Sequence, residues 1–384
     1  MTTSIEWTDV TWNPVTGCTK VSPGCKHCYA EGIADRFFAK QYEVNRDGSP
    51  REFTDVRCHE DRLDQPSHWK KPRRVFVNSM SDLFHEDVQM PFIFSVFHEM
   101  ACNPQHTFQI LTKRAERMKL LMEDAAQFIQ DEGLITSRGP WAPQFWPLPN
   151  VWLGVSVENQ KYADERIPLL LETPAAVRFL SVEPQLEAIS MDGVARGCSG
   201  WWITCPRCQG DMSEPAPGGG KSCGRCFGKD GLHHQGQIAG IDWVICGGES
   251  GPGARPFNLA WAESLLGQCK TAGVPFFMKQ IGSVPVINTE TWREKYNPIT
   301  HGWKEQDGTR FWQSARQLLP WNERQDIALA IYSRKGGDPA EWPAHLRVRE
   351  FPAAPQTGPA PPNAPLRQDF QETTEPETQD LPKP

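Results

Sequence analysis

The feature that most constrains the fold of this chain is a repeated alternation of short apolar segments with segments of helical spacing. The apolar segments are nearly continuous, as Val75, Phe76 and Val77 illustrate. Continuous apolar strands that alternate with helices are typical of a parallel sheet covered by helices. We therefore expect an α/β fold, a partial (β/α)6-type parallel barrel. Its strands are expected at residues 75–82, 107–113, 150–158, 177–184, 241–249 and 275–280, and its helices at 29–41, 91–102, 115–130, 161–171 and 259–272.

Polar residues occupy the ends of all six expected strands. In parallel α/β architectures ligands bind at the carboxyl ends of the strands, where loops present side chains. One polar strand end is uninformative, since any strand that leaves a core ends this way. Six ends rich in Ser, Glu and Lys favour a polar binding site. These ends contain Ser79, Ser81, Asp82, Thr112, Lys113, Ser156, Glu158, Asn159, Ser181, Glu183, Gly248, Glu249, Ser250, Lys279 and Gln280.

Three cysteines precede the strands in a C-x6-C-x2-C pattern, at Cys18, Cys25 and Cys28. Structural zinc sites use four protein ligands, whereas three thiolates suit a [4Fe–4S] cluster with one iron left open. A loop containing Pro and Gly at residues 23–24 could bend around such a cluster. The spacing alone leaves three interpretations open: a cluster, half of a zinc site completed by His27 or a distant ligand, or buried thiols.

Composition narrows the class of protein. The chain has 384 residues, 23% of them charged, and contains no long apolar run, and its polar start is not expected to be a signal peptide. Twelve cysteines, several in C-x2-C pairs, suit metal binding in a reducing cytoplasm better than disulfides. The net charge of −7 argues against a protein that coats nucleic acid, although basic patches can still engage DNA locally.

A second cysteine motif lies between the fourth and fifth expected strands. Two C-x2-C pairs separated by fourteen residues are a strong indication of a zinc ribbon, because two knuckles close one tetrahedron. The polar, glycine-rich interior cannot form a core, so the metal would supply the folding energy. A second iron–sulfur cluster is the alternative. The ligands would be Cys205, Cys208, Cys223 and Cys226.

Basic residues gather in this insertion, at Arg207 and Arg225, and again around Lys113 and Arg114. Contact with nucleic acid is one interpretation, and an ordinary solvated face or helix end is the other. The expected organisation is a discontinuous barrel at 1–196 and 238–352 with a zinc-ribbon insertion at 197–237. The tail at 353–384, rich in Pro, Glu and Thr, is expected to be disordered.

The N-terminal segment carries a resemblance to a known family. Residues 5–18 read IEWTDVTWNPVTGC, and Cys25 and Cys28 follow, the latter in Cys-Tyr-Ala. This pattern resembles a radical-SAM-like family common in bacteriophage genomes, and the likeness extends to about Pro352. The cysteine spacing departs from the C-x3-C-x2-C usual in the radical SAM superfamily, because the first gap is three residues longer.

The resemblance implies cofactors and residues that bind them. Cys18, Cys25 and Cys28 would hold a [4Fe–4S] cluster whose open iron binds S-adenosylmethionine, and zinc would be structural. A Gly-Gly-Glu that binds the methionyl amine is common early in radical SAM enzymes, but here Gly247, Gly248 and Glu249 lie late. The amine is therefore assigned to the early segment, and no catalytic residue is identified. Candidate cofactor-binding residues are Ser79, Ser81, Asp82, Lys113, Ser156, Glu158, Glu183, Gly247, Gly248 and Glu249.

The resemblance also implies a reaction on DNA or on a modified nucleotide, with an electron donor such as a flavodoxin-type reductant. The favoured expectation is an isomerase of thymidine hypermodification, which re-attaches an N-linked amino-acyl (glycyl) group of thymidine through its α-carbon. A DNA repair lyase of the spore-photoproduct type is an alternative, as is a non-catalytic, metal-stapled nucleic-acid adaptor. The expected compartment is the cytoplasm, of the host if a phage encodes the chain.

Overall fold

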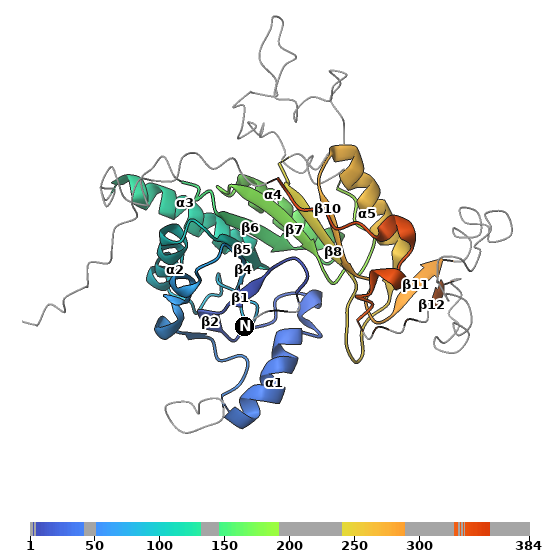
Figure 1. Cartoon of the computed structure of the whole chain (residues 1–384), viewed down its shortest axis with the longest axis horizontal. Coiled ribbons are helices and arrows are strands. Elements are labelled where there is room, and N and C mark those ends of the chain that lie inside the picture. Colours follow the sequence, from blue (N-terminus) through green and yellow to red (C-terminus); the bar gives the residue numbers. More distant parts are fainter. Residues whose placement is uncertain are drawn as a thin grey trace, which may run out of the picture.

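In a computed structural model of the chain, the main sheet is parallel and has seven strands in the order β1-β4-β5-β6-β7-β8-β10. The structure describes residues 3, 5–41, 51–131, 146–191, 240–288, 326–328, 331, 333 and 335–353. The expected zinc ribbon, and all of the expected tail except residue 353, lie outside these residues. Figure 1 shows the sheet curling from β1 to β10 into an open half-barrel.

The alternation of strands and helices confirms the parallel α/β fold. The strands are β1 (Val10–Trp12), β4 (Arg74–Val77), β5 (Thr107–Thr112), β6 (Val151–Ser156), β7 (Val177–Val182), β8 (Trp243–Gly247) and β10 (Phe276–Gln280). The sequence predicts six of these and misses β1, which pairs with β4 at the edge of the sheet. With three residues, β1 is too short to show a strand period in the sequence.

All five expected helices are present, and the last four of them contribute side chains to the large core on one face of the sheet. They are α1 (Tyr29–Gln41), α2 (Met90–Cys102), α3 (Ala115–Asp131), α4 (Gln160–Glu172) and α5 (Leu259–Ala272). Local sequence sets their ends: Asn159 and Asn258 cap the N-termini of α4 and α5 by accepting backbone N–H groups. Gly273 ends α5 in the left-handed region, at φ +66°. None of the described helices is long and apolar enough to cross a bilayer.

Short strands complete the described part of the chain. Val15–Thr16 (β2) pairs with Arg57–Cys58 (β3), next to β1. A three-stranded sheet joins Phe257–Asn258 (β9), Pro285–Asn288 (β11) and Asp326–Ala328 (β12), at the far side of α5 in Figure 1. The segment at Val348–Glu350 runs beside β10 and covers that edge, as Met278 N donates to Val348 O at 2.8 Å.

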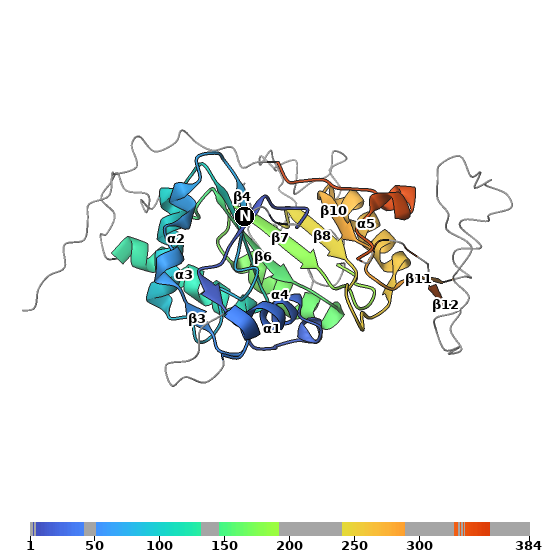
Figure 2. The ribbon, with the colours of Figure 1, turned by 60° about the horizontal axis from the view of Figure 1, so that its bottom comes forward.

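The two faces of the main sheet carry different cores. Along β4, Val75 and Val77 pack into the large core under the helices, while Phe76 faces the other way. The opposite face, called here the inner face, carries an aromatic cluster, defined as Trp7, Phe76, Trp152, Phe179, Trp243 and Phe277. The N-terminal segment, drawn in blue in Figure 2, crosses near the strands on this side and contributes Trp7.

Candidate functional site

The three cysteines of the first motif lie on one loop at the carboxyl end of β1. Cys18 comes two residues after β2, and Cys28 directly precedes α1. All three thiols are partly exposed and free of disulfides. The loop starts at Gly17, whose φ is +91° and where a Cβ would come within 2.5 Å of Asp55 O, so only glycine fits there. The segment from Gly17 to Cys28 is called the cysteine loop below.

Arg114 ties the start of the cysteine loop to the end of β5. Its guanidinium donates to Cys18 Sγ at 3.6 Å, to Thr19 Oγ1 at 3.0 Å and to Asp82 Oδ2 at 3.2 Å. Asp82 follows β4 and also accepts from Thr112 Oγ1 at 2.7 Å. Burial raises the pKa of the Cys18 thiol to about 11, and the charge of Asp82 adds to this, against the opposing effect of Arg114.

Glu158 holds the middle of the loop from the end of β6. Its carboxylate accepts a hydrogen bond from Ser22 Oγ and pairs with Arg166 of α4 at 2.8 Å. Glu158 is fully buried and Arg166 is nearly so. A Cβ on Gly24 would come within 2.6 Å of Glu158 Oε1, so the loop backbone lies directly against this carboxylate.

Glu249 holds the far end of the loop from the end of β8. His27 Nδ1 lies 3.1 Å from its carboxylate, which also accepts from Arg255 Nη2 at 2.7 Å and from Arg255 Nε at 2.9 Å. Burial raises the pKa of Glu249, but the hydrogen bonds from Arg255 and His27 outweigh it and leave that pKa below its ordinary value. Three acid–base pairs from three strand ends therefore anchor the cysteine loop.

A fourth acid–base pair lies at the ends of β7 and β10. Lys279 Nζ is 2.7 and 2.8 Å from the two carboxylate oxygens of Glu183, and Gln280 Nε2 is 3.3 Å away. Within the described residues, neither Glu183 nor Lys279 hydrogen-bonds to the cysteine loop. The pair spans β8, where Gly247 leaves room for the Glu183 side chain.

The structure brings most of the sequence-predicted residues to this edge of the sheet. Ser79 and Ser81 bond back to Asn13 and Val15, and so fix the first strand beside β4. The backbone N–H of Lys113 donates to Asp82 at 3.1 Å. Ser156 is buried, and Gly248 packs against the backbone of Ile281. As cofactor-binding residues all of these stay predictions.

Sequence reasoning missed the basic partners of the strand-end acids. The sequence favours a solvated helix end or a nucleic-acid contact for Arg114 and its neighbours, but Arg114 is 7% exposed and donates to Cys18 of the cysteine loop. Arg166 lies on the apolar side of α4 with Ala163, Ile167 and Leu170. An arginine at an apolar position of a helical pattern is the signal that could have identified it, because a buried guanidinium requires a partner.

Comparison with known proteins gives one match. Residues 2–314 match the family described as "Protein of unknown function (DUF5131)". The chain belongs to the DUF5131 family. No curated protein and no solved structure matches the chain. The DUF5131 match includes the whole cysteine loop and all four acid–base pairs, and it ends before the segment at 335–353.

The three cysteines of this DUF5131 protein are the right kind of ligand for an iron–sulfur cluster, but their side chains are not positioned to hold one. Three free thiols share one loop. In the described part of the chain, however, no group of three His, Cys, Asp or Glu side chains is arranged to hold a metal ion. The thiols would have to turn toward one another to bind a cluster. The predicted zinc ligands lie outside the described residues.

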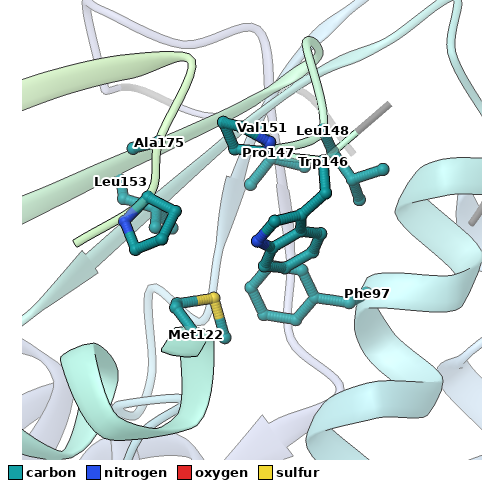
Figure 3. Close-up of a pocket in the computed structure, with 9 residues that line it drawn as sticks. Phe97, Met122, Trp146, Pro147, Leu148, Val151, Leu153 and Ala175 are labelled. Carbon is teal, nitrogen blue, oxygen red and sulfur yellow. The ribbon is translucent and has the colours of Figure 1, made fainter. Parts of the chain in front are cut away.

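A small apolar pocket of the DUF5131 protein lies among the helices, away from the carboxyl ends of the strands. Figure 3 shows Trp146, Phe97 and Met122 around a small pocket between α2, α3 and β6. Every residue that lines it is apolar, including Leu148, Val151 and Leu153. Since it contains no titratable or nucleophilic side chain, this pocket has no chemistry of its own, and the strand ends remain the candidate site.

Proposed function

We propose that this DUF5131 protein is a radical S-adenosylmethionine enzyme in which Cys18, Cys25 and Cys28 ligate a [4Fe–4S] cluster. The observation that carries the proposal is the anchoring of a loop with three free thiols at the carboxyl ends of a parallel half-barrel. Three acid–base pairs hold that loop, so its position is fixed before any cofactor binds. The resemblance of residues 5–30 to the phage radical-SAM-like family supports the same function.

The residues of the chain would bind and orient the cofactor. With S-adenosylmethionine and one electron, such a cluster supplies a 5′-deoxyadenosyl radical. Arg114 donates a hydrogen bond to Cys18 Sγ and would stabilise negative charge on that sulfur. Ser22 and His27, held by Glu158 and Glu249, would fix the loop on either side of Cys25.

We propose a nucleobase of DNA as the substrate, and this part rests on the resemblance. The favoured reaction is isomerisation of an N-linked amino-acyl (glycyl) thymidine to its Cα-linked form. Hydrogen abstraction from the glycyl α-carbon suits a radical, because the adjacent nitrogen and carboxyl stabilise the product radical. A duplex base must leave the stack to reach an enzyme site. A repair lyase or a non-catalytic adaptor is the alternative.

The cluster is tested by anaerobic reconstitution with iron and sulfide. The triple variant Cys18→Ala, Cys25→Ala, Cys28→Ala is compared with the wild type and with the double variant Cys58→Ala, Cys102→Ala. The control removes two other partly exposed, free thiols from the described residues. We expect about four irons per chain in the wild type and the control, and loss of iron and of thiolate-to-iron absorbance in the triple variant. Equal absorbance in all three proteins contradicts the proposal.

The reaction is tested with reductant, S-adenosylmethionine and DNA that carries candidate modified thymines, followed by mass analysis of the nucleosides. An isomerase forms a product of unchanged mass and altered retention, whereas a lyase changes the mass. If no substrate gives 5′-deoxyadenosine, the adaptor interpretation replaces the enzyme. Separately, replacing Cys205, Cys208, Cys223 and Cys226 should remove about one zinc per chain.

A further inference from the structure

Among the residues that the structure describes, four acid–base pairs lie at the carboxyl ends of the strands, and one of them does not hold the cysteine loop. Asp82–Arg114, Glu158–Arg166 and Glu249–Arg255 each contact the loop through a hydrogen bond. Glu183–Lys279 makes no such contact among the described residues. Its side chains are 17% and 19% exposed, whereas those of Glu158 and Arg166 are 0% and 6% exposed. Both members of this pair are therefore partly open to a ligand, whereas in each of the other three pairs the acid is at most 8% exposed.

The backbone around Lys279 favours a binding role. The pairing of β10 with β8 is irregular between Met278 and Gln280, so Lys279 lies at a β-bulge. Bulges often direct a side chain toward a site at the rim of a barrel. The bulge and the missing side chain of Gly247 let Lys279 reach Glu183 across β8.

The pair is also connected to the far end of the cysteine loop. Gln280 Nε2 lies 3.3 Å from Glu183 Oε1 and donates to Gly248 O at 2.9 Å. Gly248 directly precedes Glu249, whose carboxylate lies 3.1 Å from His27 Nδ1 of the loop. A ligand held by Glu183 would therefore lie at the same end of the sheet as the cysteine loop.

An ammonium and a carboxylate that are paired at two strand ends, on either side of β8, can exchange partners with a ligand that carries both charges. A half-buried ion pair gains little net stability, since desolvation offsets its attraction. Insertion of a zwitterion between the two side chains keeps every charge paired and adds charge-assisted hydrogen bonds. Neither a purely cationic nor a purely anionic ligand can do this, because it leaves one side chain unpaired.

We propose that Glu183 and Lys279 bind the zwitterionic α-amino-acid group of a ligand, with Glu183 receiving the ammonium and Lys279 the carboxylate. This inference rests on the proposed function, which offers two sources of such a group: the methionyl part of S-adenosylmethionine, and an amino acid attached to a nucleobase. Both present the same chemistry to the pair, and the experiment separates them.

The test is equilibrium binding measured anaerobically by calorimetry. The probes are S-adenosylmethionine, 5′-methylthioadenosine, which has no amino-acid group, glycyl-substituted thymidine monophosphate and thymidine monophosphate. The variants are Lys279→Met and Glu183→Gln. The matched control is Lys119→Met, which breaks the 2.5 Å ion pair with Glu172 between α3 and α4, away from the strand ends. Iron content and thermal unfolding are recorded for each protein.

We expect each site variant to weaken binding of one zwitterionic probe by about ten- to a hundredfold, the effect of losing a charge-assisted hydrogen bond. Its counterpart without the amino-acid group should bind unchanged. Weakening of S-adenosylmethionine assigns the pair to the cofactor, and weakening of the glycyl nucleotide assigns it to the substrate. If both zwitterionic probes bind the variants as they bind Lys119→Met, the proposal is wrong.

A charge-swapped variant, Glu183→Lys with Lys279→Glu, separates binding from folding. It keeps the ion pair across β8 and should keep the wild-type unfolding temperature, but it reverses the polarity that the ligand meets, so zwitterion binding stays weak. Restored binding contradicts the proposal. If the wild type binds no iron after reconstitution, only the proposed function is overturned. If the wild type binds each probe equally well with and without its amino-acid group, this inference is overturned, whatever the iron content.

Discussion

The aromatic cluster and the acid–base pairs at the carboxyl ends are built on the same strands. Apolar packing holds the cluster together, whereas ion pairs and hydrogen bonds hold the strand ends. Strand β7 carries Phe179 and is followed by Glu183, four residues further on. Strand β8 carries Trp243 in the cluster and Gly247 beneath the Glu183 side chain. Residues four apart on a strand share a face. Along the inner face the aromatic cluster, called the floor below, is therefore followed a short distance further on by the layer of four acid–base pairs, called the rim below.

The difference teaches where stability and specificity reside. Trp243 lies with its ring centroid 5.9 Å from those of both Phe179 and Phe277, and apolar packing of this kind tolerates varied partners. Each acid of the rim requires one particular base, since a buried charge without its partner is very costly. Substitutions in the floor should therefore reduce stability broadly, while those in the rim should act on the cysteine loop.

The largest effect is expected for Trp243→Ala. Trp243 is fully buried and donates to Glu350 O at 2.8 Å. Its ring centroid lies 5.3–6.3 Å from those of five other aromatic side chains among the described residues. Its truncation should lower the free energy of unfolding by about 3–5 kcal/mol, measured in urea. Iron bound per folded chain should not change. If the variant lost iron without losing stability, the aromatic cluster would have to act on the cysteine loop directly.

A smaller loss of about 3 kcal/mol is expected for Arg166→Met, because it leaves the buried Glu158 carboxylate without its cation. Adding Glu158→Gln should recover part of this loss, since the uncompensated charge is then removed. The two single variants and the double variant form a double-mutant cycle in urea unfolding. Additive losses would show that the two side chains do not depend on each other.

The sequence is sufficient to predict most of the fold, because the core strands are continuous apolar runs. Strands β6 and β7 are buried at every position, and α4, the helix that follows β6, has its capping residue Asn159 in the sequence. The edge strand β1 escapes prediction for a physical reason. Its three residues pair with β4 and are held by tertiary contacts such as Trp12 packing on Phe108, which a local pattern does not contain.

The site is predictable only in part. Each acid of the rim follows an expected strand, so its place at one edge follows from parallel topology. Which base pairs with which acid depends on contacts between residues far apart in sequence, such as Lys279 with Glu183 or His27 with Glu249. The sequence therefore indicates a polar site with three cysteines, but not that three of the acids anchor the loop that carries them.

Gly24→Ala tests that anchoring with a single methyl group. The new Cβ would meet Glu158 Oε1 at 2.6 Å and Glu158 Cγ at 2.7 Å, so the loop or the carboxylate must move. Overpacking of this kind costs about 1–3 kcal/mol and should lower the iron bound after reconstitution. The control is Gly32→Ala in α1, where a Cβ meets nothing within 4 Å and helix propensity improves. Equal iron in both variants would argue against a fixed loop.

The smallest effect, about 1 kcal/mol at neutral pH, is expected for Glu249→Gln, which weakens the hydrogen bonds from Arg255 and His27. The pKa of Glu249 lies below its ordinary value of 4.5, so its charge stabilises the fold above that pH. That contribution is lost as the pH falls through the lowered pKa. The stability difference between wild type and variant, measured in urea from pH 7 to pH 3, should therefore shrink in acid.

Glu172→Gln, which breaks the exposed pair with Lys119, is the control and should change stability little. If the difference in unfolding free energy between wild type and Glu249→Gln stays constant down to pH 3, Glu249 acts by packing rather than by charge. Its contribution would then be of the same kind as that of the aromatic side chains.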